Sequence, residues 1–142
     1  MRTFETRPNN GTSIPWAVDI TVGTCLRIQQ QTGVNLYDNP LGIPADIEKL
    51  EDAATLVAVL YSICHEQAME RDITFQSFAD QITGDVAKKA TSAAMEELAD
   101  FFTALVPVKG ELFRKIWRQS QTIEAKMEEA LSADLDYSTS SI

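Results

Sequence analysis

Residues 52–71 carry the most regular apolar pattern in the sequence, and they constrain the fold more than any other segment. The stripe recurs at the three- and four-residue spacing of a helix, at Leu56, Val59, Leu60, Ile63 and Cys64. Val57 and Tyr61 widen this stripe, and Asp52 stands directly before it, where an aspartate side chain accepts hydrogen bonds from the first backbone N–H groups of a helix. We therefore predict one helix over residues 52–71 at the centre of the core.

The first 22 residues have a different period. Residues 16–22 alternate apolar and polar side chains, and residues 2–7 offer a second extended segment. Asn10-Gly11 lies between them and suits the positive φ angles of a tight turn. We predict a β-hairpin over residues 1–22, which must pack on helices because an isolated hairpin is only marginally stable.

The rest of the chain contains helical patterns divided by glycine and proline. A short helix from about Thr21 or Gly23 should end at Gly33, and a loop should follow over residues 35–44. Asp72 and Thr74 are candidate caps for a short helix at residues 75–82. The fold class predicted is α+β, mainly α, with an N-terminal β-hairpin followed by about five helices in one compact domain. Its predicted parts are the hairpin at 1–22, a helical core at 23–106, a long C-terminal helix at 109–135, and a flexible tail at 136–142.

The charge balance limits the classes of partner. The sequence has 21 acidic against 12 basic residues, which gives a formal net charge of −9. Nucleic-acid duplexes and anionic membranes are both bound largely through Lys and Arg, so the composition disfavours both. The N-terminus lacks the apolar core of a secretory signal, and no apolar stretch approaches the roughly 20 residues that span a bilayer. We expect a cytoplasmic protein whose two cysteines are reduced.

Reactive side chains are few and do not form a recognisable motif. His65-Glu66 begins like the zinc-protease pattern, but the second histidine is replaced by Met69. Cys25 and Cys64 have no ligand spacing with His65 that matches a zinc site. The sequence therefore predicts no catalytic, metal or cofactor site, and a small enzyme using Cys25 or His65 is the least favoured alternative.

The C-terminal helix carries apolar residues that offer a partner-binding strip. The candidates are Phe113, Ile116, Trp117, Ile123 and Met127. Trp117, like Phe101-Phe102, is first interpreted as a core anchor. The alternative is an exposed strip that receives a helix of another protein, because this segment is long relative to the domain.

Three blocks of the sequence resemble the small tail assembly chaperones of long-tailed bacteriophages and prophages. The blocks are Trp16–Thr24 continuing to Gly33-Val34-Asn35-Leu36, then Leu56–Cys64, and finally Phe75–Phe78 with Gly84-Asp85 and Glu96–Phe102. They span residues 16–106, and the C-terminal helix matches no pattern of the family.

This resemblance implies a non-enzymatic protein that binds and solubilises the tape-measure protein during tail morphogenesis. It also implies the tail-tube protein as a second candidate partner, action in the bacterial host cytoplasm, and absence from the mature virion. The alternative is another small protein-binding adaptor, such as a head–tail connector or a regulatory module. Self-association stays open in either case.

Overall fold

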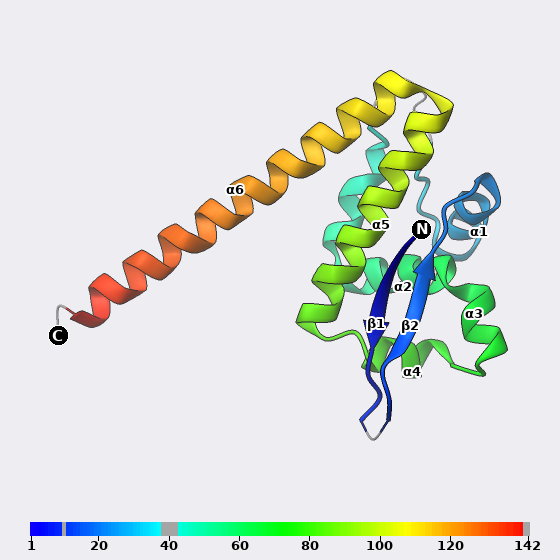
Figure 1. Cartoon of the computed structure of the whole chain (residues 1–142), viewed down its shortest axis with the longest axis horizontal. Coiled ribbons are helices and arrows are strands. Elements are labelled where there is room, and N and C mark those ends of the chain that lie inside the picture. Colours follow the sequence, from blue (N-terminus) through cyan, green and yellow to red (C-terminus); the bar gives the residue numbers. More distant parts are fainter. Residues whose placement is uncertain (10, 38–42, 141–142) are drawn as a thin grey trace.

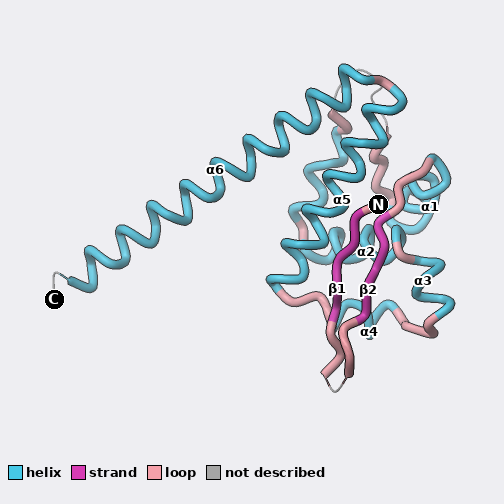
Figure 2. Tube along the Cα trace, viewed as in Figure 1, coloured by secondary structure: helices cyan, strands magenta, loops and turns pink. Residues whose placement is uncertain are grey.

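The computed structural model describes the backbone at residues 1–9, 11–37 and 43–140, and side chains up to Ala133. Over these residues the chain is mainly helical with one antiparallel hairpin at its N-terminus, which confirms the predicted fold class (Figures 1 and 2). The elements in chain order are β1 (Arg2–Thr6), β2 (Ile14–Val18), α1 (Val22–Thr32), the 3₁₀ helix η1 (Ala45–Glu51), α2 (Ala53–Ile63), α3 (His65–Glu70), α4 (Phe75–Asp80), α5 (Gly84–Leu105) and α6 (Pro107–Ser140). The hairpin lies alongside α5, and α6 leaves the end of α5 and runs away from the other elements (Figure 1).

The hairpin packs on the helices through one face. Phe4 pairs with Trp16 across the strands, and both side chains are buried. The Trp16 ring meets Phe78 of α4 edge-on, with centroids 5.1 Å apart. Its indole Nε1 donates to the hydroxyl of Thr6 at 2.9 Å, and that hydroxyl donates to Gln81 at 2.7 Å. The buried polar atoms of this interface are thus paired, as a stable buried interface requires.

The second strand is shorter than predicted. It ends at Val18, whereas the alternating pattern predicted a strand through Val22. Thr21 instead caps α1, because its hydroxyl accepts the backbone N–H of Thr24 and the Thr24 hydroxyl in turn accepts the backbone N–H of Thr21. This reciprocal capping starts the helix inside the alternating segment and leaves Val22 56% exposed in the first turn.

The predicted helix over residues 52–71 is divided in two at Cys64. Asp52 caps its start as expected, accepting from the backbone N–H of Thr55 at 3.1 Å. Just before the break, the carbonyl of Ser62 accepts a hydrogen bond from Nε of Arg27 at 2.8 Å. Arg27 of α1 therefore bonds a carbonyl that, in a continuous helix, would accept the backbone N–H four residues later. The local sequence pattern does not reveal this contact.

Two further caps were predicted at glycine and threonine positions. Gly33 ends α1 in the left-handed conformation, with φ of 78°, and its N–H donates to the carbonyl of Gln29. Thr74 caps α4 through the N–H of Ser77. Asp72 does not act as a cap; it has a positive φ of 54° in the turn before α4, a conformation that aspartate tolerates better than most residues.

The last two helices form a close hairpin. Helix α6 begins at Pro107, earlier than the predicted start near residue 109, because proline is well suited to the first position of a helix. Gly110 lies so close to α5 that a Cβ atom would collide with Thr103, including its backbone. The helix also continues through Ser140, into the segment predicted as a flexible tail.

Parts of three sequence predictions lie outside the described residues. These parts are Asn10 of the predicted turn, residues 38–42 of the predicted loop, and residues 141–142 of the predicted tail.

Candidate functional site

Helix α6 is anchored on the domain only along its first part. Phe113 is 4% exposed and meets Phe102 of α5 edge-on, with ring centroids 5.3 Å apart. Lys109 is 1% exposed, and its Nζ lies 4.3 Å from the ring centroid of Phe102 and 4.6 Å from that of Tyr37. These contacts fix the direction in which the rest of the helix leaves the domain.

The five predicted partner-binding residues fall into two groups. Phe113 is buried in the chain's own core, and Trp117 is half-buried against it. Ile116, Ile123 and Met127 are exposed by 41%, 59% and 62%. The three exposed residues are separated by seven and four positions, so they share one side of the helix.

The exposed stripe extends beyond the predicted residues. Leu131 is 61% exposed and follows Met127 by one helical turn. The stripe therefore begins beside the buried Phe113 and continues along the projecting part of α6. Apolar residues that recur along one side of a helix offer a surface on which another helix can pack.

A groove opens where α6 diverges from the domain. It has a volume of about 650 Å³ and lies between η1, the first half of α5, and α6. Its apolar lining comes mainly from Ile47, Leu50, Met95, Phe113, Ile116 and Trp117. Its charged lining is Glu48 and Glu51 from η1, Glu124 and Glu128 from α6, and Lys88 from α5. We call this feature the acidic groove.

Small residues on α5 keep the groove open. Gly84, Ala87 and Thr91 line it at three- and four-residue spacing. This site was not predicted because its acidic residues come from two segments, residues 48–51 and 124–128, that lie far apart in the sequence. The only local sign of the groove in the sequence is the row of small residues on one side of α5. Such a row is equally typical of two helices that pack closely, so it does not by itself indicate a groove.

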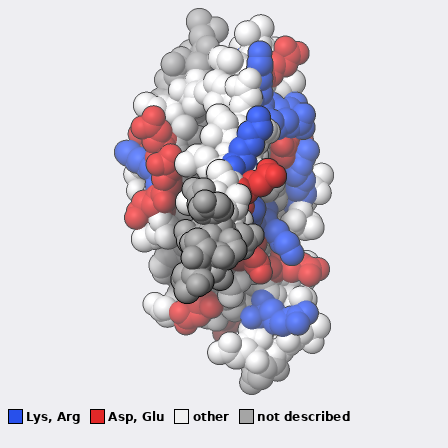
Figure 3. Space-filling view, turned by 90° about the vertical axis from the view of Figure 1, so that its left-hand side faces the viewer, with Lys and Arg blue, Asp and Glu red and all other residues white. Residues whose placement is uncertain are grey.

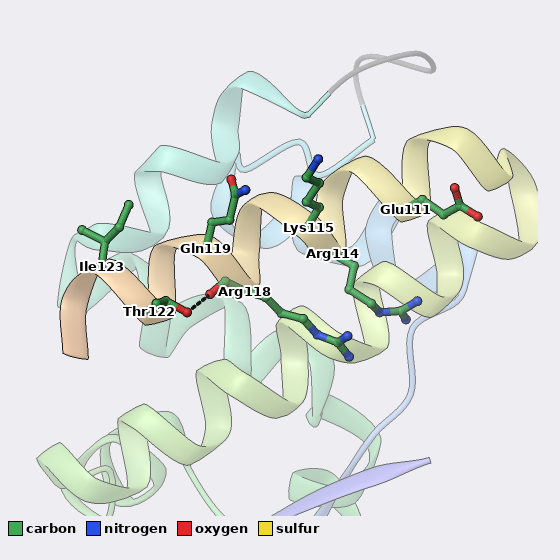
Figure 4. Close-up of a pocket in the computed structure, with 7 residues that line it drawn as sticks. All are labelled: Glu111, Arg114, Lys115, Arg118, Gln119, Thr122 and Ile123. Carbon is green, nitrogen blue, oxygen red and sulfur yellow. Dashed lines mark hydrogen bonds between the residues drawn. The ribbon is translucent and has the colours of Figure 1, made fainter. Parts of the chain in front are cut away.

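A second hollow, of about 600 Å³, lies on another side of α6. Its lining includes Arg114, Lys115 and Arg118, and Figure 4 shows the two arginines reaching toward α5. Arg114 pairs with Glu96 and Asp100, and Arg118 lies 3.5 Å from Glu96. Both guanidinium groups of this hollow are therefore paired with carboxylates of α5.

No family model matches the chain, and neither the curated proteins nor the solved structures give a significant match.

The two cysteines lie in surroundings that keep their thiols protonated. Cys25 and Cys64 are buried, and burial raises the pKa of both thiols, that of Cys64 to about 12. Both are therefore protonated near neutral pH, and a thiol is a poor nucleophile compared with a thiolate. His65 is the first residue of α3 and packs against the ring of Tyr61.

The part of the chain that the structure describes holds neither a metal-binding group of side chains nor a membrane-spanning helix. Within it, no three or more His, Cys, Asp and Glu side chains are grouped so as to hold a metal ion. No helix there is both long and apolar enough to cross a membrane.

Proposed function

We propose that this protein is a non-enzymatic phage tail assembly chaperone that binds and solubilises the tape-measure protein. The observation that carries the proposal is the projecting part of α6, where Ile123, Met127 and Leu131 are exposed by 59%, 62% and 61%. The resemblance of residues 16–106 to such chaperones supplies the class of partner. The protein acts in the host cytoplasm and is absent from the finished virion.

The exposed stripe supplies a physical reason to bind a helix. Covering one isoleucine, leucine or methionine side chain contributes about 1.5–3 kcal/mol before the entropic cost of association. A long helical partner offers the complementary seam, and its own apolar stripe is shielded in the same contact. The net charge of −9 on this chain favours solubility of the complex.

Co-expression with the tape-measure protein tests the proposal. The readouts are capture of the tape-measure protein on tagged chaperone and the fraction of it that remains soluble. The double variant Ile123→Asp with Met127→Asp places two charges in the exposed stripe. We expect at least a ten-fold loss of captured partner and a lower soluble fraction, with an unchanged melting temperature.

A matched control uses the opposite side of the same helix. Ala125→Asp with Ser132→Asp adds the same charge to two exposed positions of α6 that lie away from the stripe at 100° per residue, and should leave capture intact. Equal capture by the stripe variant and the control would show that the stripe is not the binding surface. If the unaltered protein neither captures nor solubilises a tape-measure protein, the chaperone proposal fails.

A further inference from the structure

We propose that the acidic groove receives a basic amphipathic helix of the partner. This inference deepens the proposed function and rests on it for the source of that helix.

The charge of the groove is strongly one-sided. Glu48 and Glu51 stand on one wall and Glu124 and Glu128 on the other, against the single Lys88. All five side chains are exposed. Figure 3 shows a cluster of Asp and Glu at the left edge with a basic side chain beside it, while acidic and basic side chains are interspersed at the right. A cationic occupant would relieve the repulsion between the two acidic walls.

The walls of the groove favour a helix over an extended peptide. All three walls are helical, so their backbone N–H and C=O groups are largely bonded within each element. An extended segment would find no strand edge with which to pair its own peptide groups. A helix satisfies its backbone internally and needs only side-chain contacts, which the apolar lining provides through Ile47, Met95 and Trp117.

The groove is long enough for several helical turns. Its lining on α6 runs from Phe113 to Glu128, which corresponds to about 22 Å at 1.5 Å per residue. A helix of about 15 residues has the same length. The expected occupant therefore has Lys or Arg on the flanks of an apolar stripe about four turns long.

Two synthetic peptides test the groove without the tape-measure protein. Both are fluorescent helices of about 15 residues with the same leucine stripe, one with lysine on its flanks and the other with glutamate. We expect the lysine peptide to bind at least ten-fold more tightly than the glutamate peptide, by fluorescence anisotropy. We also expect its affinity to fall as the salt concentration rises, because exposed charges are screened.

Charge-reversal variants locate the binding site. Glu48→Lys with Glu124→Lys changes one residue on each wall. This variant should lower the affinity for the lysine peptide at least ten-fold and raise the affinity for the glutamate peptide. The control is Glu66→Lys with Glu70→Lys, which makes the same change in net charge at two exposed residues of α3, outside the groove. If the control weakens the lysine peptide as much as the groove variant does, the attraction is to net charge alone and the proposal is overturned.

The peptide and capture assays separate the two proposals. Groove-dependent peptide binding without capture of the tape-measure protein would retain the groove and reject the chaperone function. Capture that depends on Ile123 and Met127, together with indifference to the Glu48 and Glu124 reversals in both assays, would retain the chaperone function and reject the groove.

Discussion

The two parts of α6 follow one amphipathic pattern but have different surroundings. In the first part, Gly110 lies against Thr103 and Phe113 is 4% exposed beneath Phe102. In the second part, Ile123 and Met127 are exposed by 59% and 62%. One helix thus carries its apolar stripe from the interior of the domain onto a projecting arm.

Because of this difference, we expect the first part of α6 to stabilise the fold and the second part to be available for binding. Phe113 in the first part contributes to the stability of the domain, because its side chain is only 4% exposed within this chain. Side chains of the second part contribute nothing comparable until another surface covers them. Substitutions in the first part should therefore change the free energy of unfolding, whereas substitutions in the second part should change partner binding.

The largest expected effect is that of Phe113→Ala. Removing a buried aromatic side chain commonly lowers the free energy of unfolding by about 3–5 kcal/mol, because it loses burial and leaves a cavity. Met127→Ala, on the same helix, should change it by less than about 0.5 kcal/mol. Urea denaturation of both variants measures the contrast. A similar loss in the two variants would mean that the arm packs on the domain in solution.

The next effect concerns the point where the two helices approach most closely. In Gly110→Ala the new Cβ would collide with the backbone of Thr103, so α6 must shift from α5. Overpacking of this kind costs about 1–3 kcal/mol. We expect a lower urea midpoint and a changed near-ultraviolet circular dichroism spectrum, since Phe102 and Phe113 meet nearby.

Gly84→Ala is the matched control for this prediction. A Cβ at Gly84 meets nothing within 4 Å, and alanine is the better residue in a helix. This variant should be as stable as the unaltered protein or more stable by up to about 1 kcal/mol. If Gly110→Ala behaves like Gly84→Ala, the close approach of the two helices is not present in solution.

Local sequence signals predicted which helices and strands form better than they predicted the residues at which these elements begin and end. Gly33 and Asp52 were placed correctly because each capping interaction involves neighbours within a few residues. The strand that ends at Val18 was overextended because the alternating pattern continues into a helix cap at Thr21. The break at Cys64 was missed because Arg27, from another helix, bonds the Ser62 carbonyl.

The candidate site depended still more on tertiary structure. Periodicity identified the stripe on α6, but it could not indicate that Phe113 would be buried and Met127 exposed. That division depends on where α6 leaves α5, which is set by Gly110 and Thr103. The acidic groove was not predicted, because Glu48 and Glu124 become neighbours of one cavity only when the chain has folded.

The smallest predicted effect concerns the polar anchoring of the first part of α6. Asp100 of α5 pairs with Arg2 of β1 at 2.7 Å and also with Arg114 of α6. These arginines, chiefly Arg2, hold the pKa of the Asp100 carboxyl below its usual value. The Asp100 side chain is 50% exposed, so Asp100→Asn should lower the free energy of unfolding at pH 7 by less than about 1 kcal/mol.

The pH dependence gives this prediction its sign. Because the folded protein holds the pKa of Asp100 below the unfolded value of about 3.9, its contribution is complete above pH 5 and is lost as the pH falls through the folded pKa. The stability difference between Asp100→Asn and the unaltered protein should therefore shrink toward zero in strong acid. Urea midpoints at pH 7 and near pH 2 measure it. A difference that stays constant with pH would show that Asp100 contributes through packing and not through its charge.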